Sequence, residues 1–398
     1  MSEQLLGDFR SYLAARGHTP GTQHQYAAVA AHFLAWLGEQ PPDRQQIDAP
    51  AVQVFLYEHL PACRCPPPNP KHRKSVRAAL NRLLVMGGET RLRPRSPPSS
   101  PSIEAMVARF DTYLRDVCGL ADATRWYRRR YVRAFLAGQF GDGPVTVGRI
   151  APDALIRFVT EQAHLQRPGS VGVLAYSLRS FLRFLQFEGE LPADLTGAVP
   201  TPPHWSLAPL PPSLSAAELA RLWGAFDRAT ALGRRDYAMA RCLADLGLRC
   251  QEVAALRLDD IDWRTGVLHL RPGKSRQAAQ LPLPAPTGAA LADYLRHGRP
   301  TTPSRALFVQ HRAPVGEVAA KTTVRGAIRR AFARAGLPWS GTHILRHTAA
   351  ARMVQGGSSL KLVADVLRHR SIDTTAIYAK VDLPNLSRVA LPWPGRSL

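Results

Sequence analysis

The segment GTHILRHTAAARM, residues 341–353, contains the most informative side chains of this 398-residue chain. Its apolar residues recur at three- and four-residue spacing, which is typical of an amphipathic helix. His343 and Arg346 are three residues apart and therefore share a face of that helix. An imidazole and a guanidinium on one face can reach the same phosphate group. The segment therefore predicts a helix that presents a phosphate-binding pair.

Further side chains of the same chemistry flank this helix on both sides. Downstream, LRHRSIDTTAIYAKVD supplies His369 and, nine residues later, Tyr378. Upstream, LGLRCQEVAALRL places Arg249 at the start of a helix, with Glu252 one turn on, and the turn PGKSRQ offers Lys274. Taken singly, each of these residues is more often a surface or core residue than a functional one. In this order, in a basic chain, they predict one site.

The region that contains these residues alternates helices with a few short strands. Ser215 and Glu218 form a capping box that starts a helix. The apolar spacing of DYAMARCLADLGLRCQEVAALRL is helical, with a break near Gly247. DDIDWRTGVLHL followed by PGKSRQAAQLPLP indicates three short strands, joined by turns at residues 264–266 and 272–278. The expected fold class is therefore mostly α, with a small antiparallel sheet in a C-terminal α+β domain that follows helical N-terminal domains.

Two proline-rich stretches, RLRPRSPPSSPS and PTPPHWSLAPLPP, divide the chain into three parts. Such segments have few backbone donors and a stiff extended preference, so they connect domains. We expect a helical domain over residues 1–90, a linker over 91–102, a second helical domain over 103–195, a proline-rich linker over 196–212 and the α+β domain over 213–398.

The two helical domains resemble copies of one another. Phe9 and Leu13 recur 101 residues later as Phe110 and Leu114, and Gly88 recurs as Gly189. Each copy closes on an apolar helical run, VRAALNRLLVMGG and SLRSFLRFLQFEG. Chance convergence of amphipathic helices is the alternative. We interpret the pattern as a repeated helical domain.

One helix of the second copy is rich in arginine. The stretch ATRWYRRRYVRAF places basic side chains among Trp126, Tyr127 and Tyr131. Guanidinium groups bind phosphates bidentately, and aromatic rings supply packing or stacking surface, so the stretch predicts DNA contact. Alternatively, the aromatic rings are core and the arginines form a solvated face. The predicted DNA-binding residues are Arg125, Arg128, Arg129, Arg130 and Arg133.

Bulk composition favours a nucleic-acid partner. The chain carries 52 basic and 30 acidic residues, a formal net charge of +22, and most of the excess lies after residue 200. A polyanion is the natural partner, and no basic amphipathic tail points to a membrane surface. The N-terminus lacks an apolar signal core, and no apolar run is long enough to span a bilayer. These observations favour a soluble cytoplasmic protein.

The five cysteines are expected to be reduced thiols, because no secretory signal places them in an oxidising compartment. His59, Cys63, Cys65 and His72 can be drawn as a zinc set. However, Cys-x-Cys is not the usual ligand spacing, and the intervening PPPNP has the composition of a loop. The expectation from sequence is therefore no metal.

Several common catalytic signatures are missing from the sequence. It contains no Walker loop, no GxGxxG after a strand, no HExxH and no GxSxG. Nucleotide hydrolysis, hydride transfer, zinc proteolysis and serine hydrolysis therefore lack their usual signals. The remaining interpretation is phosphate chemistry without a metal cage.

The pattern resembles the tyrosine recombinases of the phage integrase family, which include the Xer-type resolvases. The first family box stands here as GLRCQE, and the second as HILRH, LRH and IY in the expected order. Lys274 falls where the family has a β-turn lysine. The resemblance covers about 170 residues. It implies that residues 213–398 are the catalytic domain, that 103–195 are a core-binding DNA-binding domain and that 1–90 are a SAM-like domain.

The resemblance, together with phosphate chemistry, implies roles for these residues. Arg249 and Arg346 would bind the non-bridging oxygens of a phosphodiester, and Tyr378 would be the nucleophile. His343 would accept or share the phenolic proton, and Lys274 would protonate the departing 5′ oxygen. His369 would hydrogen-bond the phosphate, and Glu252 would brace the first arginine. The sequence departs from the family at Arg368, where glycine is usual, and in a lysine loop poorer in lysine and glycine.

These expectations together describe a site-specific recombinase or integrase, serving a mobile element, that cleaves and rejoins DNA through a 3′-phosphotyrosine without cofactor, ATP or metal. Its partners would be double-stranded DNA and three further copies in a homotetramer, with the need for accessory recombinases left open. A type IB-like topoisomerase and a catalytically weak DNA-binding relative are the alternatives.

Overall fold

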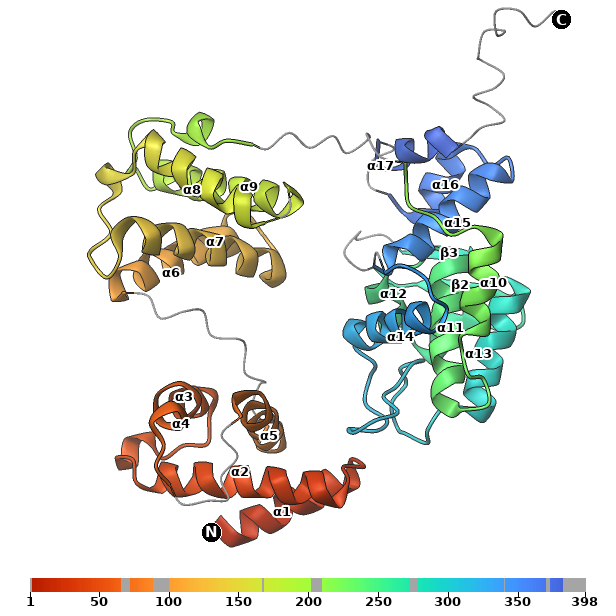
Figure 1. Ribbon diagram of the computed structural model, residues 1–398, viewed down its shortest axis with the longest axis horizontal. Coiled ribbons are helices and arrows are strands. Elements are labelled where there is room, and N and C mark those ends of the chain that lie inside the picture. The colour runs from red at the N-terminus through yellow and green to blue at the C-terminus, as the bar shows by residue number, and fades with distance from the viewer. Residues whose placement is uncertain are drawn as a thin grey trace, which may run out of the picture. The chain divides into compact units, whose positions relative to one another are not determined.

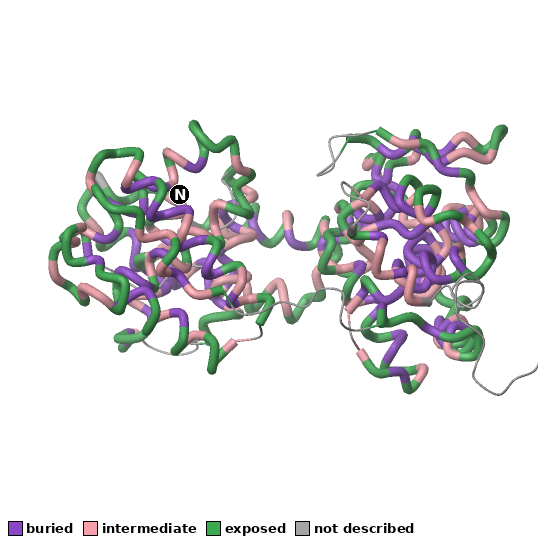
Figure 2. Tube along the Cα trace, turned by 90° about the horizontal axis from the view of Figure 1, so that it is seen from above, coloured by how far each residue is buried: buried purple, intermediate pink, exposed green. Residues whose placement is uncertain are grey.

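The protein is described from a computed structural model, and it divides into two compact units. Residues Arg93–Ser206 form one unit, and Met1–Leu92 with Leu207–Leu398 form the other. Buried residues gather in the interior of each part (Figure 2). The structure describes residues 2–65, 72–88, 100–166, 168–201, 210–272, 278–339, 341–369 and 373–381.

The N-terminal part is helical (Figure 1), and aromatic residues lie in a core of its own. The Asp48 side chain begins one helix by accepting a hydrogen bond from the Ala51 backbone at 2.8 Å. Phe9, Phe33 and Phe55 are fully buried there. The elements are α1 (Ser2–Ala15), α2 (Pro20–Gly38), the 3₁₀ turn η1 (Pro42–Arg44), α3 (Ala49–Val54), the π-helical turn η2 (Phe55–His59), α4 (Leu60–Ala62) and α5 (Arg73–Met86).

The unit Arg93–Ser206 has the same kind of construction. Pro101 and Pro152 stand in the first turn of their helices, where a missing backbone N–H costs nothing. Phe110, Phe135 and Phe181 fill its core. The elements are α6 (Pro101–Asp116), α7 (Asp122–Phe140), η3 (Val147–Arg149), α8 (Pro152–Leu165), α9 (Pro168–Phe187) and η4 (Thr196–Ala198).

The positions that the sequence matches between the two helical parts also match in structure. Phe9 and its counterpart Phe110 are both fully buried. Gly88 and Gly189 each follow the last long helix of their part with a positive φ, of 83° and 74°. Glycine adopts this left-handed conformation without steric cost, so the backbone turns at the equivalent position in both helical parts. The equivalent burial and backbone geometry support the interpretation of a repeat.

The C-terminal part is helical with one small sheet, so the predicted fold class is confirmed. The sheet is antiparallel in the order β1-β2-β3, and Leu268 lies opposite both Ile261 and Leu281. The predicted capping box of Ser215 and Glu218 is present. The elements are α10 (Ala216–Gly224), α11 (Ala231–Asp245), α12 (Cys250–Ala255), η5 (Leu258–Asp260), β1 (Ile261–Asp262), β2 (Val267–Leu270), β3 (Ala279–Pro282), α13 (Ala285–His297), α14 (Lys321–Arg334), α15 (His343–Gln355), α16 (Leu360–Leu367), α17 (Asp373–Ala376) and η6 (Ile377–Val381).

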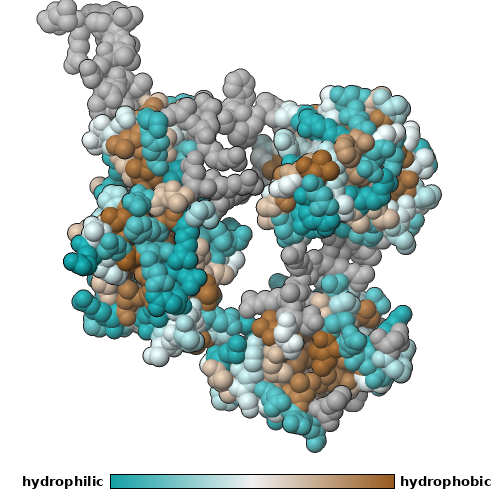
Figure 3. All heavy atoms as spheres, turned by 180° about the vertical axis from the view of Figure 1, so that it is seen from behind, coloured by the Kyte–Doolittle hydropathy of each residue, from teal (hydrophilic) through white to brown (hydrophobic). Residues whose placement is uncertain are grey.

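The surface of the protein is mixed in character. Seen from behind, hydrophilic residues cover much of the visible faces, with apolar patches between them (Figure 3). Among the helices that the structure describes, none combines the length and the apolar character that crossing a membrane requires.

Candidate active site

Arg346, on α15, links three segments of the C-terminal part. Its side chain is buried, with the residue 4% exposed. One terminal nitrogen donates to the Gly247 carbonyl at 2.5 Å, and the other donates to the carbonyl of Leu367. Leu367 ends α16, where carbonyl groups lack intrahelical partners, and a cation is favourable at that end of a helix. Arg346 therefore connects the break between α11 and α12 to the end of α16.

The break at Gly247 depends on glycine for two reasons. Its φ of 60° lies in the left-handed region. A Cβ at this position would lie 2.5 Å from Cδ2 of Leu367, which is too close for two carbon atoms. The sequence predicts a helix break here, and the structure shows that the break brings the start of α12 against the end of α16.

Arg249 stands directly before α12 and is held by Glu252. Its backbone N–H donates to one carboxylate oxygen of Glu252 at 2.7 Å, and its guanidinium donates to the other at 2.8 Å. A second guanidinium nitrogen donates to the Arg368 carbonyl at 3.4 Å. Burial raises the pKa of Glu252, but the backbone hydrogen bond from Arg249 and the charges of Arg368 and Arg249 outweigh burial and lower it overall. Glu252 is therefore an ionised brace for Arg249, in the position that the sequence suggested.

Arg368, the departure from the family pattern, caps α16 in the left-handed conformation, with φ 54° and ψ 51°. Among the described residues it is the one non-glycine with a positive φ. Such a conformation costs an L-residue about 1–2 kcal/mol, which explains why glycine suits this position. The guanidinium donates to Glu252 at 2.7 Å and to the Val366 carbonyl at 2.9 Å. These contacts offset the backbone cost and make Arg368 part of the scaffold.

Tyr378 lies in η6 with its ring in a small apolar cluster. The residue is 1% exposed and packs with Val354, Val363 and Leu367. Its hydroxyl lies 2.7 Å from Nδ1 of His347. Burial raises the pKa of the Tyr378 phenol to about 12, against the opposing effect of the Arg346 charge. The phenol is therefore protonated at neutral pH, and His347 stands next to it.

His347 contacts Tyr378, although the sequence assigned it no role. It lies in the HILRH segment, four residues after His343 and therefore one helical turn further on. The spacing placed it near the site, but only the tertiary placement of Tyr378 shows which imidazole meets the phenol. Burial, and then the charges of His343 and Arg346, lower the pKa of His347. The ring is therefore neutral at pH 7 and able to accept a proton.

The other two histidines lie near the arginines. Removal of the ring from water, and then the charges of Arg346 and Arg249, lower the pKa of His343, the first residue of α15. Burial and the same two charges lower the pKa of His369 to about 4. Nδ1 of His369 lies 2.6 Å from Oγ1 of the buried Thr375, which fixes the orientation of the ring. The charges of Arg346 and Arg249 thus act on both His343 and His369. Tyr378 is linked to this group through its contact with His347 and through the charge of Arg346. Lys274 lies outside the described residues.

The arginines of α7 divide into two groups. Arg125 and Arg129 donate to Asp111 on α6 at 3.1 and 2.8 Å, and Arg133 donates to Glu104 on α6 at 2.7 Å. These three side chains therefore join α7 to α6. Arg128 instead donates to Ser180 at 2.7 Å and lies 5.0 Å from the ring of the exposed Tyr176. The exposed Arg130 lies 5.7 Å from the ring of Trp126.

In this site an arginine and a histidine stand beside a buried tyrosine, and comparison with known proteins identifies the class to which the chain belongs. Residues 212–383 match the phage integrase family. The chain is 35% identical to a Sinorhizobium fredii (strain NBRC 101917 / NGR234) protein named as an integrase/recombinase, y4rA, covering 98% of this chain and 94% of that protein. It is 32% identical to the tyrosine recombinase XerC of Oceanobacillus iheyensis, covering 71% of this chain and 94% of that protein.

A solved structure shares the fold. A lambda integrase tetramer bound to a Holliday junction matches with a TM-score of 0.54 and 18% identity, covering 68% of this chain and 78% of the integrase chain. With the two sequence relatives, this confirms the resemblance seen in the sequence. The chain belongs to the phage integrase family of tyrosine recombinases.

Proposed function

We propose that this protein is a site-specific integrase that cleaves double-stranded DNA with Tyr378, holds the 3′ end as a phosphotyrosine and rejoins it to a second DNA end. The observation that carries the proposal is the 2.7 Å contact between the Tyr378 hydroxyl and His347, beside Arg346. A nucleophile, its base and a cation for the phosphate stand together there.

Electrostatics supports a phosphate substrate. Arg249 and Arg368 both donate to the carboxylate of Glu252, whose charge also acts on Arg346. Arg346 itself is held by backbone carbonyls. Burial, and then the charge of Arg249, lower the pKa of Arg346 to about 10, so the guanidinium remains charged at pH 7. The excess positive charge can bind a phosphodiester and stabilise the charge that gathers on its non-bridging oxygens during attack.

The proposal assigns the proton transfers to His347, because of its contact with Tyr378, and to Lys274, because of the family resemblance. His347 accepts the phenolic proton as the Tyr378 oxygen attacks phosphorus, so the base in this proposal is His347 in place of His343. His343 and His369 donate hydrogen bonds to the phosphate, and Lys274 protonates the departing 5′ oxygen. The phosphotyrosine conserves the energy of the broken bond, so rejoining needs no ATP. Arginines supply the cationic charge, so the reaction needs no metal.

The assembly and setting are also proposals. The lambda integrase of similar fold is a tetramer on a Holliday junction, which supports a homotetramer on two DNA duplexes. Arg128 and Arg130 of α7 are the proposed DNA contacts of the core-binding domain. The similarity over 94% of a bacterial protein named as an integrase/recombinase supports service to a mobile element. We also propose a cytoplasmic location, where a DNA substrate would be available.

A nicked suicide substrate made from the DNA that flanks the gene tests the proposal. In buffer without ATP or magnesium, the wild-type chain should form a covalent adduct whose tryptic peptide carries nucleotide on Tyr378. Tyr378→Phe should abolish the adduct and leave binding nearly unchanged, whereas the matched control Tyr237→Phe should keep both. Adducts that survive Tyr378→Phe contradict the proposal. Steady relaxation of a supercoiled plasmid that lacks the target would point instead to a topoisomerase.

A further inference from the structure

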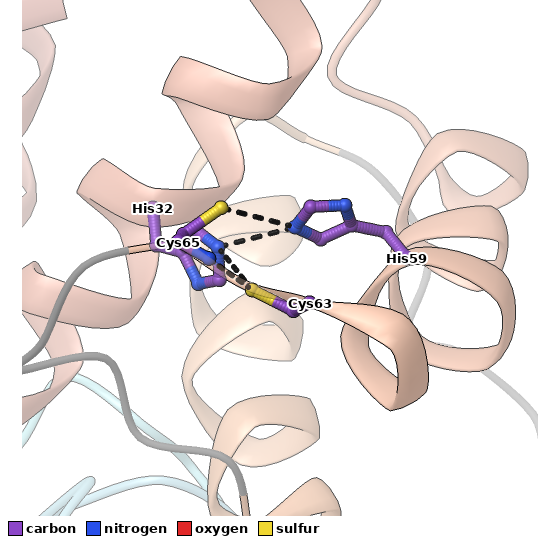
Figure 4. A group of neighbouring side chains, drawn as sticks. All are labelled: His32, His59, Cys63 and Cys65. Carbon is purple, nitrogen blue, oxygen red and sulfur yellow. Dashed lines mark hydrogen bonds between the residues drawn. The ribbon is translucent and has the colours of Figure 1, made fainter.

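A second cluster of histidines lies in the N-terminal part, in a region that the proposed reaction does not use. His32, His59, Cys63 and Cys65 point toward one another (Figure 4). Each offers one nitrogen or sulfur atom, and these four atoms lie within 4.8 Å of one another. We call these four residues the His/Cys cluster. His72, which the sequence suggested as a ligand, is exposed and outside the group, and His32 from α2 takes its place.

We propose that the His/Cys cluster binds one structural zinc ion. Zinc prefers a tetrahedron of nitrogen and sulfur ligands, with metal distances of about 2.05 Å to nitrogen and about 2.3 Å to sulfur. In such a tetrahedron the ligand atoms are separated by about 3.3 Å for two nitrogens and about 3.6 Å for nitrogen and sulfur. Three of the six separations in the cluster are close to these values, and all six are within 4.8 Å. Nε2 of His32 lies 3.2 Å from Nε2 of His59 and 3.4 Å from Sγ of Cys63, and Sγ of Cys65 lies 3.8 Å from Nε2 of His59.

The local backbone explains how the tight Cys-x-Cys spacing can serve one ion. Cys63 follows α4 with φ −63° and ψ 125°, an extended conformation. In an extended segment, side chains two residues apart point to the same side, so Cys63 and Cys65 can face one centre. The Cys65 backbone N–H also donates to Cys63 Sγ at 3.4 Å. Such a hydrogen bond stabilises a metal-bound thiolate.

A π-helical turn and an aromatic shell hold the two imidazoles in place. The turn η2 ends at His59, and the Leu60 backbone N–H donates to the Phe55 carbonyl, five residues earlier. This wider turn inserts one residue and often marks a functional position in a helix. The Phe55 ring lies 5.0 Å from His32 and 5.1 Å from His59, between centroids. Trp36 lies 5.7 Å from His59.

Charge and burial favour a metal in this place. His32 and Cys63 are each 8% exposed, so their polar atoms are largely removed from water. Zinc with two thiolates and two neutral imidazoles forms a site of zero net charge, which is less costly to bury than an isolated ion. The two thiols release their protons when the ion binds. All four coordination positions come from the protein, which is the arrangement of a structural site and leaves no position for a substrate.

Metal content and cobalt spectroscopy of the full-length chain test the proposal. The wild-type protein, purified under reducing conditions from zinc-containing medium, should hold one zinc per chain. Cobalt(II) in its place should give the visible bands of a tetrahedral ion and a thiolate charge-transfer band. Cys65→Ser and His59→Asn should bind zinc at least about 100-fold more weakly, since even outer partners of metal ligands contribute 10- to 100-fold.

Matched variants separate loss of the ion from loss of the fold. His72→Asn and Cys118→Ser change exposed residues outside the cluster and should keep one zinc per chain with an unchanged cobalt spectrum. Circular dichroism of Cys65→Ser in excess zinc reports whether that variant is folded. A wild-type chain without zinc and without the thiolate band overturns the proposal, as does a Cys63–Cys65 disulfide found under the same conditions. Equal loss of zinc in His72→Asn and His59→Asn also overturns it. These measurements are independent of DNA cleavage.

Discussion

The protein contains two clusters of histidines whose neighbours give them opposite chemistry. In the C-terminal part, His343, His347 and His369 stand among guanidinium groups, which repel cations and attract an anion. In the N-terminal part, His32 and His59 stand beside two thiols, which attract a cation once deprotonated. An imidazole can hydrogen-bond a phosphate or ligate a metal. The guanidinium groups or thiols beside it therefore decide whether the site is suited to a phosphate or to a metal.

The largest expected effect concerns an arginine beside the histidines of the C-terminal part. Arg249→Ala should slow cleavage of a suicide substrate by about 1,000-fold, because it removes one donor to the charge that develops on the phosphate. Binding to the same DNA, measured by gel shift, should weaken by less than about 10-fold, since phosphate contacts are many. Arg329→Ala, an exposed arginine on α14, is the control and should leave cleavage unchanged. Equal losses of binding and cleavage would show that Arg249 does not act specifically on the transition state.

A smaller effect tests which histidine serves the nucleophile. His347→Gln should slow cleavage by about 100-fold, because a neutral amide fills the space without accepting the phenolic proton effectively. The decisive measurement uses a substrate with sulfur at the 5′ bridging position, whose departure needs no proton. This substrate should restore cleavage by Lys274→Ala and should not restore cleavage by His347→Gln. His297→Gln, at the exposed end of α13, is the control. Rescue of His347→Gln would assign His347 to the leaving group.

The smallest effect concerns the pKa of a single imidazole. Burial and the charges of Arg346 and Arg249 lower the pKa of His369 to about 4 in the free protein. A phosphate against the ring favours the charged form, so DNA should raise the pKa of His369 by at least about one unit. Carbon-13 NMR of labelled histidine, titrated with and without DNA on Tyr378→Phe, measures the shift, and His32 should not respond. An unchanged pKa for His369 would mean that this ring does not touch the phosphate.

The sequence allowed much of the C-terminal site to be predicted because its signals are local. The spacing of His343 and Arg346, the capping acid Glu252 and the order of the motifs can all be read along the chain. The role proposed for His347 could not be predicted from the sequence, because it depends on where η6 packs against α15. The left-handed Arg368 was recognised as a departure, but its ion pair with Glu252 joins residues 116 positions apart.

The His/Cys cluster shows the same limit. Cys63 and Cys65 were visible as neighbours, but the ligand set drawn from the sequence extended to His72 and missed His32. His32 lies on α2, 27 residues before His59, in a helix that otherwise supplies core residues. Only the packing of α2 against the turn at Phe55–His59 brings the two rings together. The repeat, by contrast, was predicted from buried positions that recur at a fixed distance along the chain.

The two backbone contacts of Arg346 make the proposed site depend on the folding of the whole C-terminal part. One of its partners, Gly247, precedes it by 99 residues, and the other, Leu367, follows it by 21. A chain still emerging from the ribosome, or one partly unfolded by heat, has not brought these segments together and so has no working centre. The proposed DNA cleavage therefore depends on completion of the C-terminal fold.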